Sequence, residues 1–162
     1  MNYEFNKDLL DGKKGEYIAQ ELLRDDFGKL EVVKGECEFY DLIGRTTVEV
    51  KTDLYSKKTG NFALEYAKTN GKLTGISVSQ AEYYFIICFD KESIGYEDLV
   101  YNKGWWMGYL LKTDVLKELA HRFSVTKTIG GDNGDVNLIL IPVDEIREYS
   151  EMQYYIKPLK KD

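Results

Sequence analysis

The sequence predicts an α/β fold with a central mixed sheet, because a helical period near the start of the chain gives way to strand periods. Apolar residues recur at helical spacing over 7–27 and alternate at every second position over 47–53. Helical patterns return near 113–123 and after Pro142. Helices at both ends of a strand-rich middle are typical of the α/β class.

Length and composition favour one domain over 1–162, with a core region at about 7–90 and C-terminal additions over 101–162. The chain has 162 residues, of which 43% are hydrophobic and 14% aromatic, and no Pro-rich or Ser-rich linker divides it. Two distant cysteines and a single histidine disfavour a disulfide framework and a Cys/His zinc site. No apolar run approaches the roughly 20 residues of a membrane-spanning helix, so we expect a soluble, cytoplasmic protein without a membrane partner.

The first helix is expected from Lys7 to Phe27, with Gly28 as its stop. Its apolar stripe contains five residues within about 60° of Glu16 on a helical wheel: Leu9, Gly12, Ala19, Leu23 and Phe27. A carboxylate in that stripe incurs a desolvation cost unless it meets a cation. The alternative is a glutamate at the edge of the stripe that reaches water.

Strand periods follow the helix and predict a meander. Its four expected strands are 30–34, 39–43, 47–53 and 61–67. The segment 83–89 is expected as a central strand buried on both faces, after a short helical or turn segment, and 105–111 as a further strand. Thr113 is expected to N-cap a helix that ends near Phe123, and a strand over 138–141 precedes a last short helix.

The candidate chemistry lies on the strand 47–53, where Glu49 and Lys51 share the face opposite the apolar positions. A three-residue turn after Ile43 pairs Leu42 with Val48 and places Asp41 opposite Glu49, with Cβ atoms about 4.5–5.5 Å apart. Two carboxylates that close repel unless a cation or a proton lies between them. The alternatives are a solvated Glu-x-Lys face and a two-residue turn, which would move Asp41 opposite Val48.

Asp41 and Glu49 are therefore predicted to bind Mg²⁺, which suits a site built from oxygen anions. Glu16 is predicted to complete the metal shell through water. Lys51 is predicted to stabilise the charge that develops during phosphodiester hydrolysis, or to orient the attacking water.

The spacing Asp41-x7-Glu49-Val50-Lys51 resembles the motif of the PD-(D/E)XK nuclease superfamily, which has the restriction-endonuclease-like fold. Glu16 is similar to the first-helix glutamate of archaeal Holliday-junction resolvases and small phage nucleases. The resemblance implies an αβββαβ core and an Mg²⁺-dependent deoxyribonuclease in which Mn²⁺ can substitute. It also implies that the backbone carbonyl of Val50 is a metal ligand. Tyr40 departs from the motif, because a proline is usual at that position.

Further residues near the motif are weaker candidates. Glu65 is a candidate accessory acid on the next strand, and Gln80 matches a Gln-x-x-x-Tyr element of some nucleases in this superfamily. The candidates for contacts with the DNA backbone also include Lys57, Lys58, Lys68, Lys72 and Ser77. The alternative for these side chains is a solvated loop or a helix cap.

The formal net charge of −6 disfavours a nonspecific nucleic-acid coat, but the charge is unevenly distributed. Six basic and three acidic residues over 45–75 give a local +3, and five basic and two acidic residues over 101–131 give another. We expect DNA as the partner, a homodimer, and selectivity for branched junctions or a phage-type activity in the host cytoplasm. The alternative is an inactive nuclease-fold protein that binds or inhibits.

Overall fold

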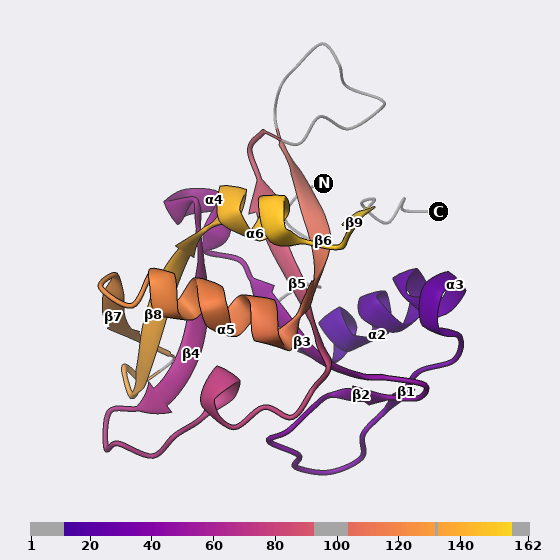
Figure 1. Ribbon diagram of the computed structural model, residues 1–162, viewed down its shortest axis with the longest axis horizontal. Coiled ribbons are helices and arrows are strands. Elements are labelled where there is room, and N and C mark those ends of the chain that lie inside the picture. Colours follow the sequence, from indigo (N-terminus) through magenta and orange to yellow (C-terminus); the bar gives the residue numbers. More distant parts are fainter. Residues whose placement is uncertain (1–11, 93–103, 132, 157–162) are drawn as a thin grey trace.

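The computed structural model describes residues 12–92, 104–131 and 133–156 (Figure 1). In chain order its elements are α2 (Gly12–Leu22), α3 (Arg24–Phe27), β1 (Glu31–Val32), β2 (Leu42–Ile43), β3 (Thr47–Asp53), α4 (Ser56–Thr59), β4 (Asn61–Lys68), η1 (Gly75–Ser77), β5 (Tyr83–Asp90), β6 (Trp105–Lys112), α5 (Thr113–Arg122), β7 (Lys127–Gly130), β8 (Val136–Pro142), α6 (Val143–Tyr149) and β9 (Met152–Tyr155). Within these ranges no helix is long and apolar enough to cross a membrane.

The strands form a mixed six-stranded sheet and a separate three-stranded sheet. The larger sheet has the order β1-β2-β3-β5-β6-β9, in which β3 and β5 are parallel and all other neighbours are antiparallel. The smaller sheet has the order β4-β8-β7 and is antiparallel. The predicted α/β class with a mixed sheet is confirmed.

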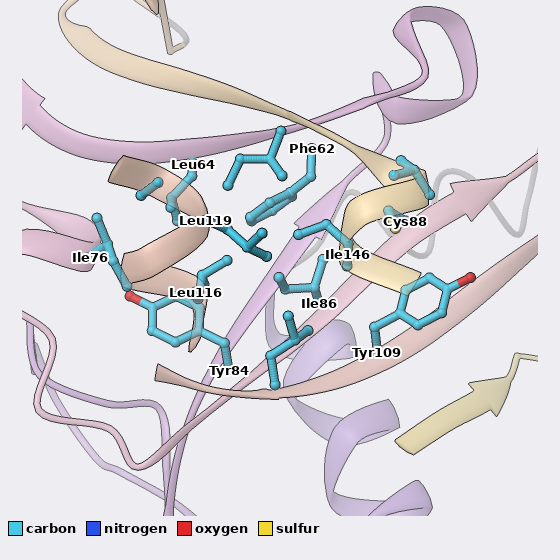
Figure 2. Close-up of a cluster of buried hydrophobic side chains, with 14 of the residues drawn as sticks. Phe62, Leu64, Ile76, Tyr84, Ile86, Cys88, Tyr109, Leu116, Leu119 and Ile146 are labelled. Atoms are coloured by element: carbon cyan, nitrogen blue, oxygen red, sulfur yellow. The ribbon is translucent and has the colours of Figure 1, made fainter. Parts of the chain in front are cut away.

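Both faces of the larger sheet are covered, so β5 is buried along almost its whole length. Helix α2 packs on one face, where Ala19 and Leu23 join the core that contains Val48 and Val50. The smaller sheet, α5 and α6 cover the opposite face (Figure 1). Figure 2 shows this second core, in which Tyr84 and Ile86 of β5 meet side chains from β4 and both helices.

Several predicted elements agree with the structure. The strand 47–53 matches β3, and 83–89 and 105–111 lie within β5 and β6. The expected first helix is divided into α2 and α3 at Leu23, and its predicted start at 7–11, including Leu9, lies outside the described residues. Gly28 ends it as predicted, with a φ of 72° and its N–H bonded to the Arg24 carbonyl.

The predicted meander is wrong at its fourth strand. The segment 61–67 leaves the larger sheet and pairs as β4 with β8, while β5 takes the place beside β3. The first two expected strands are shortened to the two-residue β1 and β2. Thr113 is not an N-cap, because Lys112 occupies that position and the Thr113 hydroxyl donates to the Ala81 carbonyl at 2.6 Å.

Candidate active site

The hairpin that carries the candidate motif has the predicted register. Leu42 lies opposite Val48, and the three residues 44–46 form the turn, with the Gly44 N–H bonded to the Thr46 carbonyl at 2.9 Å. Of the residues of β3, β2 pairs only with Thr47 and Val48, so it leaves the edge of β3 uncovered from Glu49 onward. The motif therefore lies where one strand of the hairpin ends and the other continues.

Asp41 lies beyond the end of β2 and uses its side chain in place of backbone pairing. Its Oδ2 accepts the Val50 N–H at 2.8 Å, while its own N–H donates to the Val48 carbonyl at 3.0 Å. The N–H and C=O groups of a strand residue point to the same side of the strand, so the Val50 carbonyl also points toward this edge. The Asp41 carboxylate and the Val50 backbone thus meet at the uncovered edge of β3.

Glu49 and Lys51 form an ion pair on one face of β3, with 2.6 Å between Glu49 Oε1 and Lys51 Nζ. The Glu49 side chain is only 8% exposed, whereas that of Lys51 is 39% exposed. The Lys51 side chain therefore lies between the buried Glu49 carboxylate and the solvent. Tyr84 of β5, which lies opposite Glu49 in the register, is fully buried beside the pair.

The pKa values of the pair reflect the competition between burial and charge. Burial raises the pKa of Glu49, and the negative charges of Asp41 and Glu65 add to this effect, while Lys51 opposes it. Burial alone would lower the pKa of Lys51, but attraction by Glu49, Asp41 and Glu65 raises it. Three carboxylates therefore act on one lysine, and a further cation would relieve their repulsion.

Glu65 of β4 belongs to this cluster although β4 lies in the other sheet. The backbone of η1 packs tightly against it, because a Cβ atom on Gly75 would lie 2.2 Å from the Glu65 carbonyl oxygen. Gly75 has a φ of 52°, so only glycine adopts this conformation easily. Glu65, the accessory acid predicted from the sequence, therefore acts on Glu49 through its charge, and the tight contact with η1 fixes its backbone.

Glu16 lies on α2 and is partly buried. Helix α2 lies on the face of β3 that carries Val50 and Thr52, and a Cβ atom on the adjacent Gly15 would lie 2.6 Å from Thr52 Oγ1. Glu49 and Lys51 project from the opposite face. The predicted role of Glu16 through a metal-bound water stays a prediction.

A cleft of about 340 Å³ runs along β3 beside the motif. Its lining includes Val50 and Lys51, Gly12 at the start of α2, and Tyr55 after the end of β3. Tyr55 is 76% exposed and was not among the residues predicted from the sequence. The available signal was an aromatic residue in a polar turn directly after the motif strand.

The predicted phosphate-binding lysines are divided between α4 and the end of β4 with the turn that follows it. Lys57 and Lys58 lie on α4, where Lys57 Nζ is 4.9 Å from the centre of the Phe89 ring. Lys68 is the last residue of β4, and Lys72 Nζ lies 3.9 Å from Glu38 Oε2.

Two further predicted residues lie on the segment between β4 and β5. Ser77 lines a separate hollow beside His121. Gln80 is exposed, and its backbone N–H donates to the Phe39 carbonyl at 3.0 Å, which tethers the segment before β5 to the loop before Asp41.

The side chains at the motif fit Mg²⁺ by their chemistry. Among the described residues no three His, Cys, Asp or Glu side chains stand close enough to hold a metal together. Mg²⁺ in proteins is usually held by one or two carboxylates and keeps several waters. Asp41, Glu49 and the Val50 carbonyl provide that kind of donor set at an open strand edge.

No protein-family model, curated protein or solved structure matches the chain.

Proposed function

We propose that this protein is an Mg²⁺-dependent deoxyribonuclease with Asp41, Glu49 and Lys51 as its catalytic residues. The observation that carries the proposal is the joint placement of these side chains at the open edge of β3. Asp41 is tied to the Val50 N–H, and Glu49 is paired with Lys51 at 2.6 Å. An acid before the strand and an acid-x-lysine triplet on it are what the PD-(D/E)XK resemblance requires.

We further propose a restriction-endonuclease-like core. Helix α2, the antiparallel strands β1, β2 and β3, and then β5 parallel to β3 support the order αβββαβ. The chain departs from that order between β3 and β5, where α4, β4 and η1 replace a single crossover helix. Strand β4 then supplies Glu65 to the site.

The residues have distinct roles in phosphodiester hydrolysis. Asp41 and Glu49, with the Val50 carbonyl, would hold the ion, and Glu65 would tune the charge of Glu49. A bound Mg²⁺ ion supplies polarisation of the phosphate and a lowered pKa for a bound water. The Lys51 side chain is partly exposed, and its ammonium stabilises the negative charge that grows on the phosphate oxygens.

The test is incubation of the purified chain with linear, supercoiled and four-way-junction DNA, in Mg²⁺ or in EDTA. We expect cleavage in Mg²⁺ that disappears in EDTA and in both Asp41→Ala and Lys51→Ala. Asp25→Ala, which changes an exposed residue of α3, is the matched control. Equal cleavage by Asp41→Ala and the wild type would contradict the proposal.

The same experiment addresses the proposed preference for DNA form and the alternative function. Symmetric incision of the junction in preference to the linear duplex would support a resolvase-like enzyme, and a dimeric mass in solution would support paired incisions. Binding of all three DNA forms without cleavage in Mg²⁺ would favour the inactive binding or inhibitory protein.

A further inference from the structure

The rim of the cleft beside Lys51 carries an exposed aromatic ring. Tyr55 is 76% exposed and lines the same 340 Å³ cleft as Val50 and Lys51. The preceding residue, Leu54, packs against the core beneath α2. The turn after β3 therefore directs one apolar side chain inward and presents the other, an aromatic, to whatever enters the cleft.

The turn that presents Tyr55 is held by buried hydrogen bonds. The Asp53 carboxylate accepts the Ser56 N–H at 3.1 Å and the Ala63 N–H at 2.8 Å, and the Ser56 hydroxyl accepts the Phe89 N–H at 2.9 Å. The Tyr55 carbonyl accepts two N–H groups of α4 at 2.9 Å. The backbone that carries the Tyr55 ring is therefore fixed before a ligand binds, which lowers the entropy cost of binding.

The charges around Tyr55 are positive. Lys57 and Lys58 follow it on α4, and both are exposed. The only carboxylate of this turn, Asp53, is buried and occupied by backbone N–H groups. A surface that combines an exposed ring with lysines suits a nucleic-acid strand, whose bases stack on aromatic rings and whose phosphates attract cations.

We propose that the cleft binds DNA as a single strand, with one unpaired base stacked on Tyr55. This inference rests on the proposed nuclease function and narrows its substrate to single-stranded, flapped or frayed DNA. In a closed duplex the faces of the bases are stacked on one another, so only an unpaired base can cover the ring. Tyr55 is four positions after Lys51 in the chain, so their Cα atoms are at most about 13 Å apart, which corresponds to about four stacked nucleotides.

The test is fluorescence anisotropy of the full chain with a labelled single-stranded oligonucleotide and a labelled duplex, in EDTA so that neither is cut. We expect Tyr55→Ala to raise the Kd for the single strand by about 5-fold or more and to leave the duplex unchanged. Tyr55→Phe keeps the ring and is expected to bind as the wild type. The matched control is Tyr17→Ala, which removes a ring that is 62% exposed on α2 and does not line the cleft.

A second arm locates the stacked base. The substrate in this arm is a flapped DNA that the protein cuts at one position, used in place of the four-way junction. Abasic sites are introduced into it one at a time, within about four nucleotides of the cut. One such site should remove the difference in Kd between wild type and Tyr55→Ala, because the ring then has no base to stack on. Tyr55→Ala should unfold at the same temperature as the wild type, which verifies that the exposed substitution leaves the fold intact.

The outcomes separate this inference from the proposed function. If DNA is cleaved in Mg²⁺ while Tyr55→Ala and Tyr17→Ala bind equally well, the inference is overturned and the nuclease stands. If no DNA is cleaved but single strands still depend on Tyr55, the nuclease is overturned and the binding site stands. Absence of single-strand binding by the wild type overturns the inference.

Discussion

Lys51 Nζ lies 2.6 Å from Glu49 Oε1, so the partly exposed lysine of the motif is paired with a buried carboxylate. This contact explains how a carboxylate with a raised pKa is kept in a core that also contains Tyr84. It also means that removal of either partner changes both charge and protonation at the site.

Lys51→Met should lower the rate of DNA cleavage by about 100- to 1000-fold, the usual effect of losing one group that stabilises transition-state charge. The loss should appear in kcat rather than in KM, since the charge is needed most when the phosphate reacts. Lys112→Met, which removes an exposed lysine 3.6 Å from Glu151, is the control and should cleave normally. Single-turnover rates of the three proteins decide the matter, and a Lys51→Met rate equal to that of the control would be the contrary result.

Glu65→Gln should move the acidic limb of the pH profile to lower pH. Cleavage requires an ionised Glu49, whose pKa is raised by burial and further by the charge of Glu65. Removal of that charge lowers the pKa of Glu49, so with increasing pH the cleavage rate begins to rise at a lower pH than in the wild type. The measurement is the cleavage rate against pH, with the exposed Glu118→Gln of α5 as control. Complete loss of activity in Glu65→Gln would instead make Glu65 indispensable and contradict a tuning role.

The position of α2 against the motif strand depends on Gly15. In Gly15→Ala the new Cβ atom would lie 2.6 Å from Thr52 Oγ1, so the helix or the Thr52 side chain must shift. We expect a loss of about 1–3 kcal/mol in the free energy of unfolding. In Gly12→Ala on the same helix the new Cβ atom meets no other atom within 4 Å, so the free energy of unfolding should not fall. Urea denaturation compares the two, and equal stabilities would show that α2 does not pack as described.

Tyr109→Phe should destabilise the protein by about 1.5–3 kcal/mol near neutral pH, because the Tyr109 hydroxyl donates to the buried Asp90 carboxylate. Burial would raise the pKa of Asp90, but hydrogen bonds from Tyr109 and Arg147 outweigh it and hold this pKa below its usual value. The stabilisation is therefore present above about pH 4 and is lost as the pH falls through the lowered pKa.

The check on Tyr109 is thermal unfolding of both proteins across this pH range. The difference between wild type and Tyr109→Phe should shrink in acid. Tyr149→Phe, which removes a hydroxyl that is bonded to Arg122 at the surface, should have little effect at any pH. A Tyr109→Phe difference that stays constant down to the most acidic pH would show that Asp90 ionisation is not its source.

The sequence predicted local features of the site that depend on periodicity and turn length. The alternation of Val48 and Val50 with Glu49 and Lys51 predicted both β3 and the face of the ion pair, and the turn after Ile43 predicted the register. The side-chain bond from Asp41 to the Val50 N–H could not be read from strand alternation, because the carboxylate replaces a backbone partner.

Long-range pairing was the part that the sequence did not predict. Strand β4 pairs with β8, about 75 positions later in the chain, and no local pattern distinguishes this partner from the neighbouring β3. The parallel pairing of β3 with β5 likewise depends on the crossover between them. The effect of Glu65 on Glu49 depends on both pairings, whereas its alternation on β4 alone favoured a solvated glutamate.

The central claim is that Asp41 and Glu49 hold one divalent ion, and Mn²⁺ titration followed by electron paramagnetic resonance tests it most directly. The wild type and the Asp25→Asn control should each bind one Mn²⁺ that Mg²⁺ displaces. Asp41→Asn and Glu49→Gln should each weaken that binding by about 10-fold or more, since each removes a charged ligand. Equal Mn²⁺ affinity in the wild type, Asp41→Asn and Glu49→Gln would contradict the account.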